Sequence, residues 1–262
     1  RTPSYLDDFV TEESDSDGVH ITVDYCCRAV CGIPQTYERA MESPNSKEWL
    51  KAMDEEIHSL NENKTFTPTK LPIGKKTVGG RWIYSIKTDV DGKDKYKARF
   101  VAKGYSQKQG VDYGETFSPT ADLTSVRVVL QKAAQENLLL HQMDVKTAYL
   151  HAPIDYEIYI NPPEGYQEKE DIVYKLEKSL YGLKQSGRNW NKILHDCLID
   201  DSFTQNPADH CVYTKESNEG KVIIIIWVDD LIIAASNKER LKNVKKMLAE
   251  KFKMKDLGKL KH

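Results

Sequence analysis

Residues 222 to 235 read VIIIIWVDDLIIAA, two apolar runs that flank a pair of adjacent acids. Because the runs are rich in β-branched residues and the acids stand where a turn belongs, the stretch predicts an antiparallel hairpin with Asp229 and Asp230 at its tip. Aspartate is a common turn residue, so the pair can be explained by turn formation alone. Two carboxylates beside a hydrophobic core nevertheless cost free energy unless something neutralises them, which indicates a cationic partner at the tip.

The charge of the chain is unevenly distributed. The 262 residues have a net charge of −2 and allow one large domain or two smaller ones. Residues 64–108 carry twelve Lys and Arg against three Asp, and residues 238–262 carry ten against three acids. A single basic stretch is usually a solvated face. Two basic stretches flanking a carboxylate pair favour a polyanionic partner.

Cysteine usage and hydropathy favour an intracellular protein that makes no contact with a membrane. The five cysteines form no even framework, no secretory signal opens the chain, and no apolar run approaches a membrane span. Cys26, Cys27 and Cys31, near His20, match no zinc-binding spacing and are expected to be ordinary thiols. Residues 1–36 are acidic and irregular, as in a linker. Both ends are expected to be cuts from a longer polypeptide.

The pattern of apolar residues predicts a mixed fold. In PNSKEWLKAMDEEIHSL, Asn45 can cap a helix, Glu48 can close a capping box, and Trp49, Met53, Ile57 and Leu60 fall on one face. Further expected elements are a basic hairpin from strands 82–87 and 96–105, a helix over 125–140, a strand at 172–176, a helix from 186, strands flanking the acidic tip, and a helix from 238 to about 252. This order favours an α+β fold, an antiparallel sheet with helices on one face.

A third acid, Asp144 in QMDVKTAYL, follows a helix and a short strand-like run. Taken alone it is explained as a helix cap or turn residue. At a strand end, however, its carboxylate could stand beside Asp229 and Asp230. Mg²⁺ prefers one or two protein carboxylates together with substrate phosphates, so three acids beside a basic hairpin indicate phosphoryl or nucleotidyl transfer.

Five blocks in this order resemble the reverse transcriptase of copia-type LTR retrotransposons: EWLKAMDEEIHSLNENKTF, YKARFVAKGYSQKQGVDYGETFSP, QMDVKTAYLHAPIDYEIYINPPEGY, LYGLKQSGRNWN and WVDDLIIAAS. The resemblance covers residues 37–262 and implies the fingers and palm of a right-handed polymerase, ending before the thumb and RNase H domain. It implies addition of dNTPs to a primer on an RNA or DNA template, with two Mg²⁺ ions and Mn²⁺ as a substitute. A copia-type polyprotein would work in the cytoplasm, within a virus-like particle, with a nuclear phase.

The same resemblance assigns roles to single residues. Asp144, Asp229 and Asp230 match the catalytic, metal-binding aspartates, with Asp230 the less direct ligand. Tyr149 matches the aromatic steric gate that excludes a ribose 2′-OH; without the resemblance it would be a buried aromatic at a helix start. Gln185 matches a glutamine that contacts the incoming nucleotide; unaided, it would be a solvated residue at a helix start.

Basic residues complete the implied site. Lys97 and Arg99 alternate onto one face of a strand, as two cations reaching one triphosphate would, and Lys87 on the preceding strand is a third candidate. Lys253 or Lys255 lies where polymerases often place a general acid that protonates pyrophosphate. Trp227 replaces the usual tyrosine before the acidic pair and would contact the primer end.

Two other functions fit parts of the sequence. One is a catalytically inert remnant that keeps the fold and acts as a nucleic-acid-binding or interaction module. The other is a different palm nucleotidyltransferase, such as a nucleotide cyclase-like enzyme. The KQS block and the Tyr149 gate favour a reverse transcriptase over a cyclase, and the three intact aspartates argue against decay of the site. The oligomeric state is not determined by the sequence.

Overall fold

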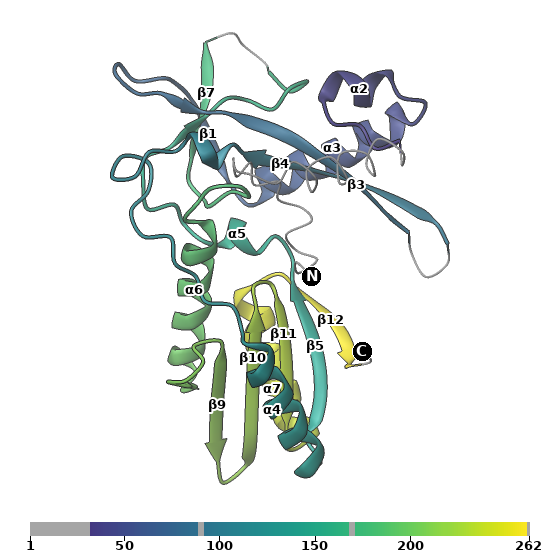
Figure 1. Ribbon diagram of the computed structural model, residues 1–262, viewed down its shortest axis with the longest axis vertical. Coiled ribbons are helices and arrows are strands. Elements are labelled where there is room, and N and C mark those ends of the chain that lie inside the picture. The colour runs from purple at the N-terminus through teal and green to yellow at the C-terminus, as the bar shows by residue number, and fades with distance from the viewer. Residues whose placement is uncertain (1–31, 89–91, 168–170, 261–262) are drawn as a thin grey trace, which may run out of the picture. The chain divides into compact units, whose positions relative to one another are not determined.

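The computed structural model describes residues 32–88, 92–167 and 171–260, and the chain divides into two compact units (Figure 1). Unit 1 comprises residues 1–113 and 154–184, and unit 2 comprises residues 114–153 and 185–262. Residues 1–31 of the predicted linker, and with them Cys26, Cys27 and Cys31, lie outside the described residues. Within those ranges, no helix is long and apolar enough to cross a membrane.

Unit 1 contains the amphipathic helix that the sequence predicts. α3 (Ser46–Glu62) begins after Asn45 and buries Trp49, Met53 and Leu60 against β4. The side chain of Asn45 makes no capping hydrogen bond in the described part of the chain, so the predicted capping interaction is wrong. Packing of the apolar face is nevertheless enough to form α3, because most of the stability of a helix in a protein comes from packing of that face.

Unit 1 also contains two small sheets. β3 (Gly80–Thr88) and β4 (Asp94–Ala102) pair in antiparallel fashion, which confirms the basic hairpin. A second sheet has the order β1-β7-β6-β2, with β2 parallel to β6 and the other pairs antiparallel. The remaining elements of unit 1 are β1 (Phe66–Lys70), β2 (Thr77–Val78), β6 (Tyr159–Ile160), β7 (Ile172–Leu176), helix α2 (Tyr37–Glu42) and a 3₁₀ turn, η2 (Gly104–Ser106).

A carboxyl group links α3 to the hairpin. Glu56 accepts a hydrogen bond from the backbone N–H of Phe100 on β4, at 3.3 Å. Burial raises the pKa of Glu56 from its ordinary value of 4.5 to about 7, although the Phe100 hydrogen bond and the charges of Arg99 and Lys97 oppose the change. Glu56 therefore binds its proton more tightly in the folded chain than in the unfolded chain.

This proton binding makes stability depend on pH. Below pH 4.5 Glu56 is protonated in both states, and as the pH rises toward 7 only the unfolded chain releases the proton, so the free energy of unfolding should fall by up to about 3 kcal/mol. Glu56→Gln should lack this decrease, because glutamine stays neutral. Urea unfolding of both proteins at pH 5 and pH 8 measures the difference; parallel pH profiles would contradict the assignment.

Unit 2 is built on one antiparallel sheet of order β12-β5-β11-β10-β9-β8 (Figure 1). Its centre is the predicted hairpin, and the four consecutive isoleucines of its first strand, residues 223–226, are buried on both faces of the sheet. The strands are β5 (Leu139–Val145), β8 (Thr204–Gln205), β9 (Val212–Ser217), β10 (Gly220–Trp227), β11 (Asp230–Ala235) and β12 (Met254–Lys259). The helices are α4 (Leu123–Gln135), α5 (Ala148–His151), α6 (Ser186–Asp200) and α7 (Lys238–Lys251).

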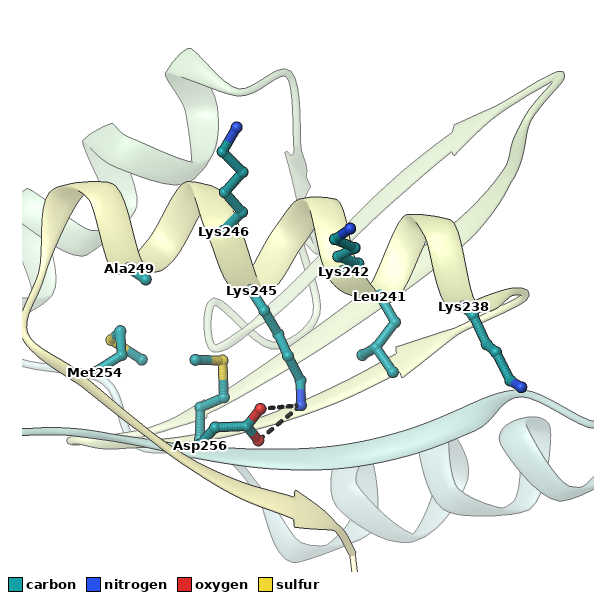
Figure 2. Close-up of a pocket in the computed structure, with 9 residues that line it drawn as sticks. Lys238, Leu241, Lys242, Lys245, Lys246, Ala249, Met254 and Asp256 are labelled. Carbon is teal, nitrogen blue, oxygen red and sulfur yellow. Dashed lines mark hydrogen bonds and ion pairs between the residues drawn. The ribbon is translucent and has the colours of Figure 1, made fainter.

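Helices cover both faces of this sheet, so the prediction of helices on one face is wrong. Residues of α7 share a cavity with Met143 of β5, whereas residues of α4 share a different cavity with Gln142 of the same strand. Because neighbouring side chains of a strand point to opposite faces, α7 and α4 lie on opposite sides. Figure 2 shows α7 on one side of β5 and α4 on the other. The hairpin is hydrophobic at consecutive positions because both its faces are covered.

The predicted helix over residues 125–140 ends earlier than expected. α4 ends at Gln135, and Asn137 takes a left-handed conformation with φ of +53°. Asparagine is one of the few residues that adopt this conformation readily, and it often follows a helix end. Leu139 and Leu140 then pair with Ala235 and Ala234 of β11. The two leucines belong to β5 because pairing with β11 outweighs their helical propensity.

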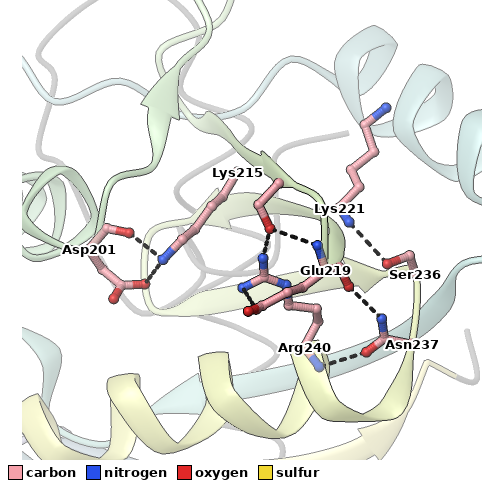
Figure 3. Close-up of polar contacts among 8 residues, drawn as sticks. Asp201, Lys215, Glu219, Lys221, Ser236, Asn237 and Arg240 are labelled. Atoms are coloured by element: carbon pink, nitrogen blue, oxygen red, sulfur yellow. Dashed lines mark hydrogen bonds and ion pairs between the residues drawn. The ribbon is translucent and has the colours of Figure 1, made fainter.

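Polar contacts fix α7 to the end of the hairpin remote from the acidic tip (Figure 3). Asn237 caps α7 as predicted, since its side-chain oxygen accepts from the N–H of Arg240 at 2.9 Å. The amide of Asn237 also donates to the Glu219 carbonyl, and Arg240 contacts the carboxylate of Glu219 and the hydroxyl of Ser217. These contacts set the direction in which α7 returns along the sheet.

Candidate active site

The acidic tip of the hairpin is a two-residue turn. Trp227 pairs with Asp230 at the ends of β10 and β11, which leaves Val228 and Asp229 as the turn. Val228 has φ of +57°, in the left-handed region. Branched side chains disfavour this conformation, so the turn stores strain that its surroundings must balance.

Two hydrogen bonds hold the backbone of this turn. The indole N–H of Trp190, on α6, donates to the Val228 carbonyl at 2.7 Å. The backbone N–H of Val145 donates to the Asp229 carbonyl at 2.9 Å. Because Val145 follows Asp144 directly, the second bond places the turn beside the end of β5. Asp229 is thereby brought next to the strand that carries Asp144.

Strand register aligns three titratable groups across the sheet. Asp144 on β5 lies opposite Asp230 on β11, and on its other side it lies opposite Lys255 on β12. Side chains of paired residues project from the same face, so the two carboxylates and the ammonium group share one face. The prediction that Asp144 stands at a strand end beside the hairpin tip is confirmed.

Asp230 has a further partner. The amide of Gln142, two residues before Asp144, donates to an oxygen of Asp230 at 3.1 Å. Burial raises the pKa of Asp230 above its ordinary value and the negative charge of Asp144 raises it further, while the hydrogen bond from Gln142 lowers it. The environment of Asp230 therefore favours a neighbouring positive charge.

The position of Lys255 depends on a contact under α7. Lys245 donates to both carboxylate oxygens of Asp256 at 2.7 Å (Figure 2). Its ammonium group also lies 2.7 Å from Nδ1 of His141. Lys245 thus joins α7 to both β12 and β5. Because Asp256 follows Lys255, this contact helps to hold Lys255 in register with Asp144. Lys253 precedes β12, and its carbonyl accepts from the N–H of Lys146 at 2.9 Å.

The donor groups at the tip fit a divalent cation of the magnesium type. Carboxylate oxygens are the ligands that Mg²⁺ prefers, and it commonly takes one or two of them while phosphates and water complete its shell. Among residues 32–88, 92–167 and 171–260, however, no group of three or more His, Cys, Asp and Glu side chains is gathered so that it could hold a metal ion.

A cavity of about 270 Å³ lies beside the tip in unit 2. Its lining combines apolar side chains of α4 and the sheet with the polar groups of Gln142 and Asp230; the residues are Leu123, Val126, Gln142, Ile225, Trp227, Asp230, Ile232 and Leu260. Trp227 packs against the core as a partly buried residue. The Trp227 indole therefore forms part of the wall next to Asp230.

The remaining residues expected at the site in unit 2 come from α5 and α6. Tyr149 is partly buried against the core near the start of α5, after Thr147 in a left-handed conformation. Gln185 precedes the first residue of α6 and is fully buried. Its interpretation as a solvated residue is therefore wrong. The sequence contains no local signal for this burial, because Gln185 lies among polar residues.

The expected triphosphate-binding cations belong to unit 1. Lys97 and Arg99 lie on one face of β4, because Ala98 and Phe100 between and beyond them are buried on the other. The Arg99 guanidinium lies 4.9 Å from the centroid of the Tyr181 ring. Lys87 is exposed on β3, and its cross-strand partner is Lys95. The alternation predicted for the hairpin is confirmed, whereas contact of these cations with phosphate stays a prediction.

Residues 63–262 match the family profile described as "Reverse transcriptase (RNA-dependent DNA polymerase)". The chain belongs to the reverse transcriptase family. It is 39% identical over 229 residues to the retrovirus-related Pol polyprotein from transposon TNT 1-94 of Nicotiana tabacum, a match that covers 86% of this chain and 17% of that polyprotein. The predicted resemblance to copia-type reverse transcriptases is thereby confirmed.

Other relatives of this reverse transcriptase domain give the same result. The Pol polyprotein from transposon RE1 of Arabidopsis thaliana is 35% identical over 221 residues, covering 83% of this chain and 15% of the relative. The transposon Ty1-DR4 Gag-Pol polyprotein of Saccharomyces cerevisiae is 30% identical over 224 residues, covering 84% and 13%. The chain thus spans less than a fifth of the length of these relatives. It is a reverse transcriptase domain of the kind found in retrotransposon Pol polyproteins.

Proposed function

We propose that this reverse transcriptase domain catalyses template-directed DNA synthesis on an RNA or DNA template. The observation that carries the proposal is the alignment of Asp144 opposite Asp230, with the Asp229 turn hydrogen-bonded to Val145 beside them. In the reaction, the primer 3′-hydroxyl releases its proton to solvent and its oxygen forms a bond to the α-phosphorus of a dNTP, while the bond from that phosphorus to the bridging oxygen breaks. Pyrophosphate leaves with the bonding electron pair.

The carboxylates of Asp144 and Asp229 would hold Mg²⁺, with Mn²⁺ as a substitute, and Asp230 would be the less direct ligand. When bound, two such ions lower the pKa of the primer hydroxyl and neutralise the leaving pyrophosphate. Lys255 is the better placed of the two general-acid candidates, because its register puts it on the face of Asp144. It would donate a proton to pyrophosphate.

Other residues would bind the substrates. Trp227 would contact the primer end. Gln185 is fully buried, so its contact with the incoming nucleotide would require the residues around it to open. Lys87, Lys97 and Arg99 would bind the triphosphate through charge-assisted hydrogen bonds. Binding of the template and primer should weaken steeply with salt, because neutralising phosphates releases counterions.

Primer extension by the 262-residue chain tests the proposal. A labelled DNA primer on an RNA template should be extended when Mg²⁺ and dNTPs are present, and extension should stop when EDTA is added. Template-dependent choice of the added base would exclude a nucleotide cyclase-like reaction. Salt-sensitive binding of the template and primer without extension would instead favour the inert nucleic-acid-binding remnant.

Tyr149→Ala tests the steric gate. If the ring lies where a ribose 2′-OH would project, its removal should raise the ratio of kcat/KM for rNTPs to that for dNTPs by roughly tenfold or more. Tyr149→Phe should leave the ratio near its original value, since it retains the ring. Single-nucleotide incorporation kinetics measure both. Equal sugar selection by the alanine variant and the unmutated chain would refute the gate.

A further inference from the structure

The Val228 carbonyl and the Trp190 indole satisfy each other. In a two-residue hairpin turn the carbonyl of the first turn residue points away from the strand ladder and finds no partner there, so an additional donor stabilises it. Tryptophan carries a single side-chain donor, and that donor lies 2.7 Å from the Val228 oxygen. Trp190 is 1% exposed, so water does not replace this bond readily.

The indole is itself held in place. Its ring packs edge-on against Phe252, with a centroid separation of 5.1 Å. On α6 the preceding residue, Asn189, donates to the Pro153 carbonyl at 3.4 Å. Trp190 also lies on the helix that begins after the buried Gln185. The Trp190 indole N–H is therefore held in a fixed position relative to the first turns of α6. Through its hydrogen bond to Val228, it also holds the hairpin tip in place.

The hydrogen bond from Trp190 is made to Val228, the strained residue of the turn. Val228 has φ of +57°, which a branched residue adopts at a cost, and Asp229 follows it directly. A change at Val228 that relaxed this conformation would turn the Asp229 peptide and move its carboxylate. The hydrogen bond from Trp190 opposes that change, as does the bond from Val145 to the Asp229 carbonyl.

We infer that Trp190 is a positioning residue, whose indole N–H holds the Val228–Asp229 turn in the conformation that presents Asp229. The inference rests on the proposed function for its effect on catalysis, but not for its effect on the turn. Its role differs from simple packing, because it requires the N–H group and depends on the strain at Val228. Both requirements can be tested separately.

The test combines Trp190→Phe, Val228→Gly and the double variant. Phenylalanine keeps a ring against Phe252 and removes the donor, so kcat should fall about tenfold while KM for dNTP changes little. Glycine adopts positive φ without strain, so the turn should then need the donor less. In the Val228→Gly background, Trp190→Phe should therefore lower kcat only about twofold. An equal loss of kcat in both backgrounds would overturn the inference.

Amide hydrogen exchange gives a second measurement that needs no activity. Exchange of the segment 226–232 should be roughly tenfold faster in Trp190→Phe. Trp82→Phe is the matched control, because the buried Trp82 indole also donates to a backbone carbonyl, that of Glu164 at 3.0 Å, within unit 1. That variant should leave exchange of segment 226–232 unchanged. Identical exchange in the two variants would contradict a role for Trp190 at the turn.

The unmutated protein and the Val228→Gly variant supply a third measurement, which decides the matter if Trp190→Phe does not fold. Of the four indole N–H groups, that of Trp190 should exchange slowly with solvent, and its resonance should shift in Val228→Gly. Rapid exchange of this proton would refute the hydrogen bond. If the unmutated chain extends no primer, the proposed function fails, while the exchange measurements still decide whether Trp190 holds the turn.

Discussion

Asp229→Asn is expected to reduce Mg²⁺-dependent primer extension by about 10³-fold, or ~4 kcal/mol of transition-state stabilisation. Asparagine has nearly the same shape but lacks the negative charge, and the hydrogen bond from Val145 to the backbone carbonyl of residue 229 would remain. The loss of activity should therefore reflect loss of the Asp229 carboxylate as a metal ligand and not a change in the conformation of the turn. Asp144→Asn should have an effect of similar size, because Asp144 stands beside the turn on β5.

Single-turnover extension with a pre-bound primer and template measures this loss in the chemical step. Asp200→Asn is the matched control, an exposed aspartate at the end of α6 in the same unit, and should retain full activity. Circular dichroism and template affinity should be unchanged in all three variants. Extension by Asp229→Asn within a fewfold of the unmutated chain would remove Asp229 from the mechanism.

Ile224→Ala is expected to destabilise the protein by about 4 kcal/mol, and thermal unfolding should shift down by roughly 10 °C. Ile224 is 0% exposed and lies on β10 between Tyr213 and Ile233 of the neighbouring strands. Helices cover both faces of this sheet, so the structure has little freedom to collapse into the cavity. The loss of stability caused by Ile224→Ala should therefore lie near the upper end of the range of about 2–5 kcal/mol for core substitutions of this kind.

Two matched variants separate burial from residue type. Ile224→Val removes one methylene group and should cost about 1 kcal/mol. Ile199→Ala makes the same change as Ile224→Ala on α6, where Ile199 is 43% exposed, and should cost less than about 1 kcal/mol. Urea and thermal unfolding measure all three. A similar cost for Ile224→Ala and Ile199→Ala would show that the hairpin is not the core of unit 2.

Local patterns predicted the secondary structure well where one face of an element is buried. The helix carrying Trp49, Met53 and Leu60, the basic hairpin and the Asn237 cap all follow from nearby residues. The predicted end of α4 was wrong, because Leu139 and Leu140 pair with residues far along the chain. The prediction of helices on one face was also wrong, although the uninterrupted apolar run of β10 is the pattern of a strand buried on both faces.

In the candidate site, too, some features could be predicted from the sequence and others could not. The amino-acid types at Asp144, Asp229 and Asp230, together with the family resemblance, are enough to indicate the chemistry. The partners of these residues did not follow from the sequence. Gln142 meets Asp230 across 88 residues of chain, and Trp190 meets Val228 across 38. Neither contact belongs to a motif, so neither could be predicted.

By itself, the sequence determined most of the longer elements, the antiparallel hairpin with its acidic tip, and membership of the reverse transcriptase family, because these depend on local propensity and on matching blocks. The tertiary structure decided the row of Lys255, Asp144 and Asp230, the burial of Gln185, and the hydrogen bond that holds the strained Val228. The physical reason is strand register. A shift of one residue would turn every side chain of a strand to the opposite face, and register is set by the packing of the whole sheet.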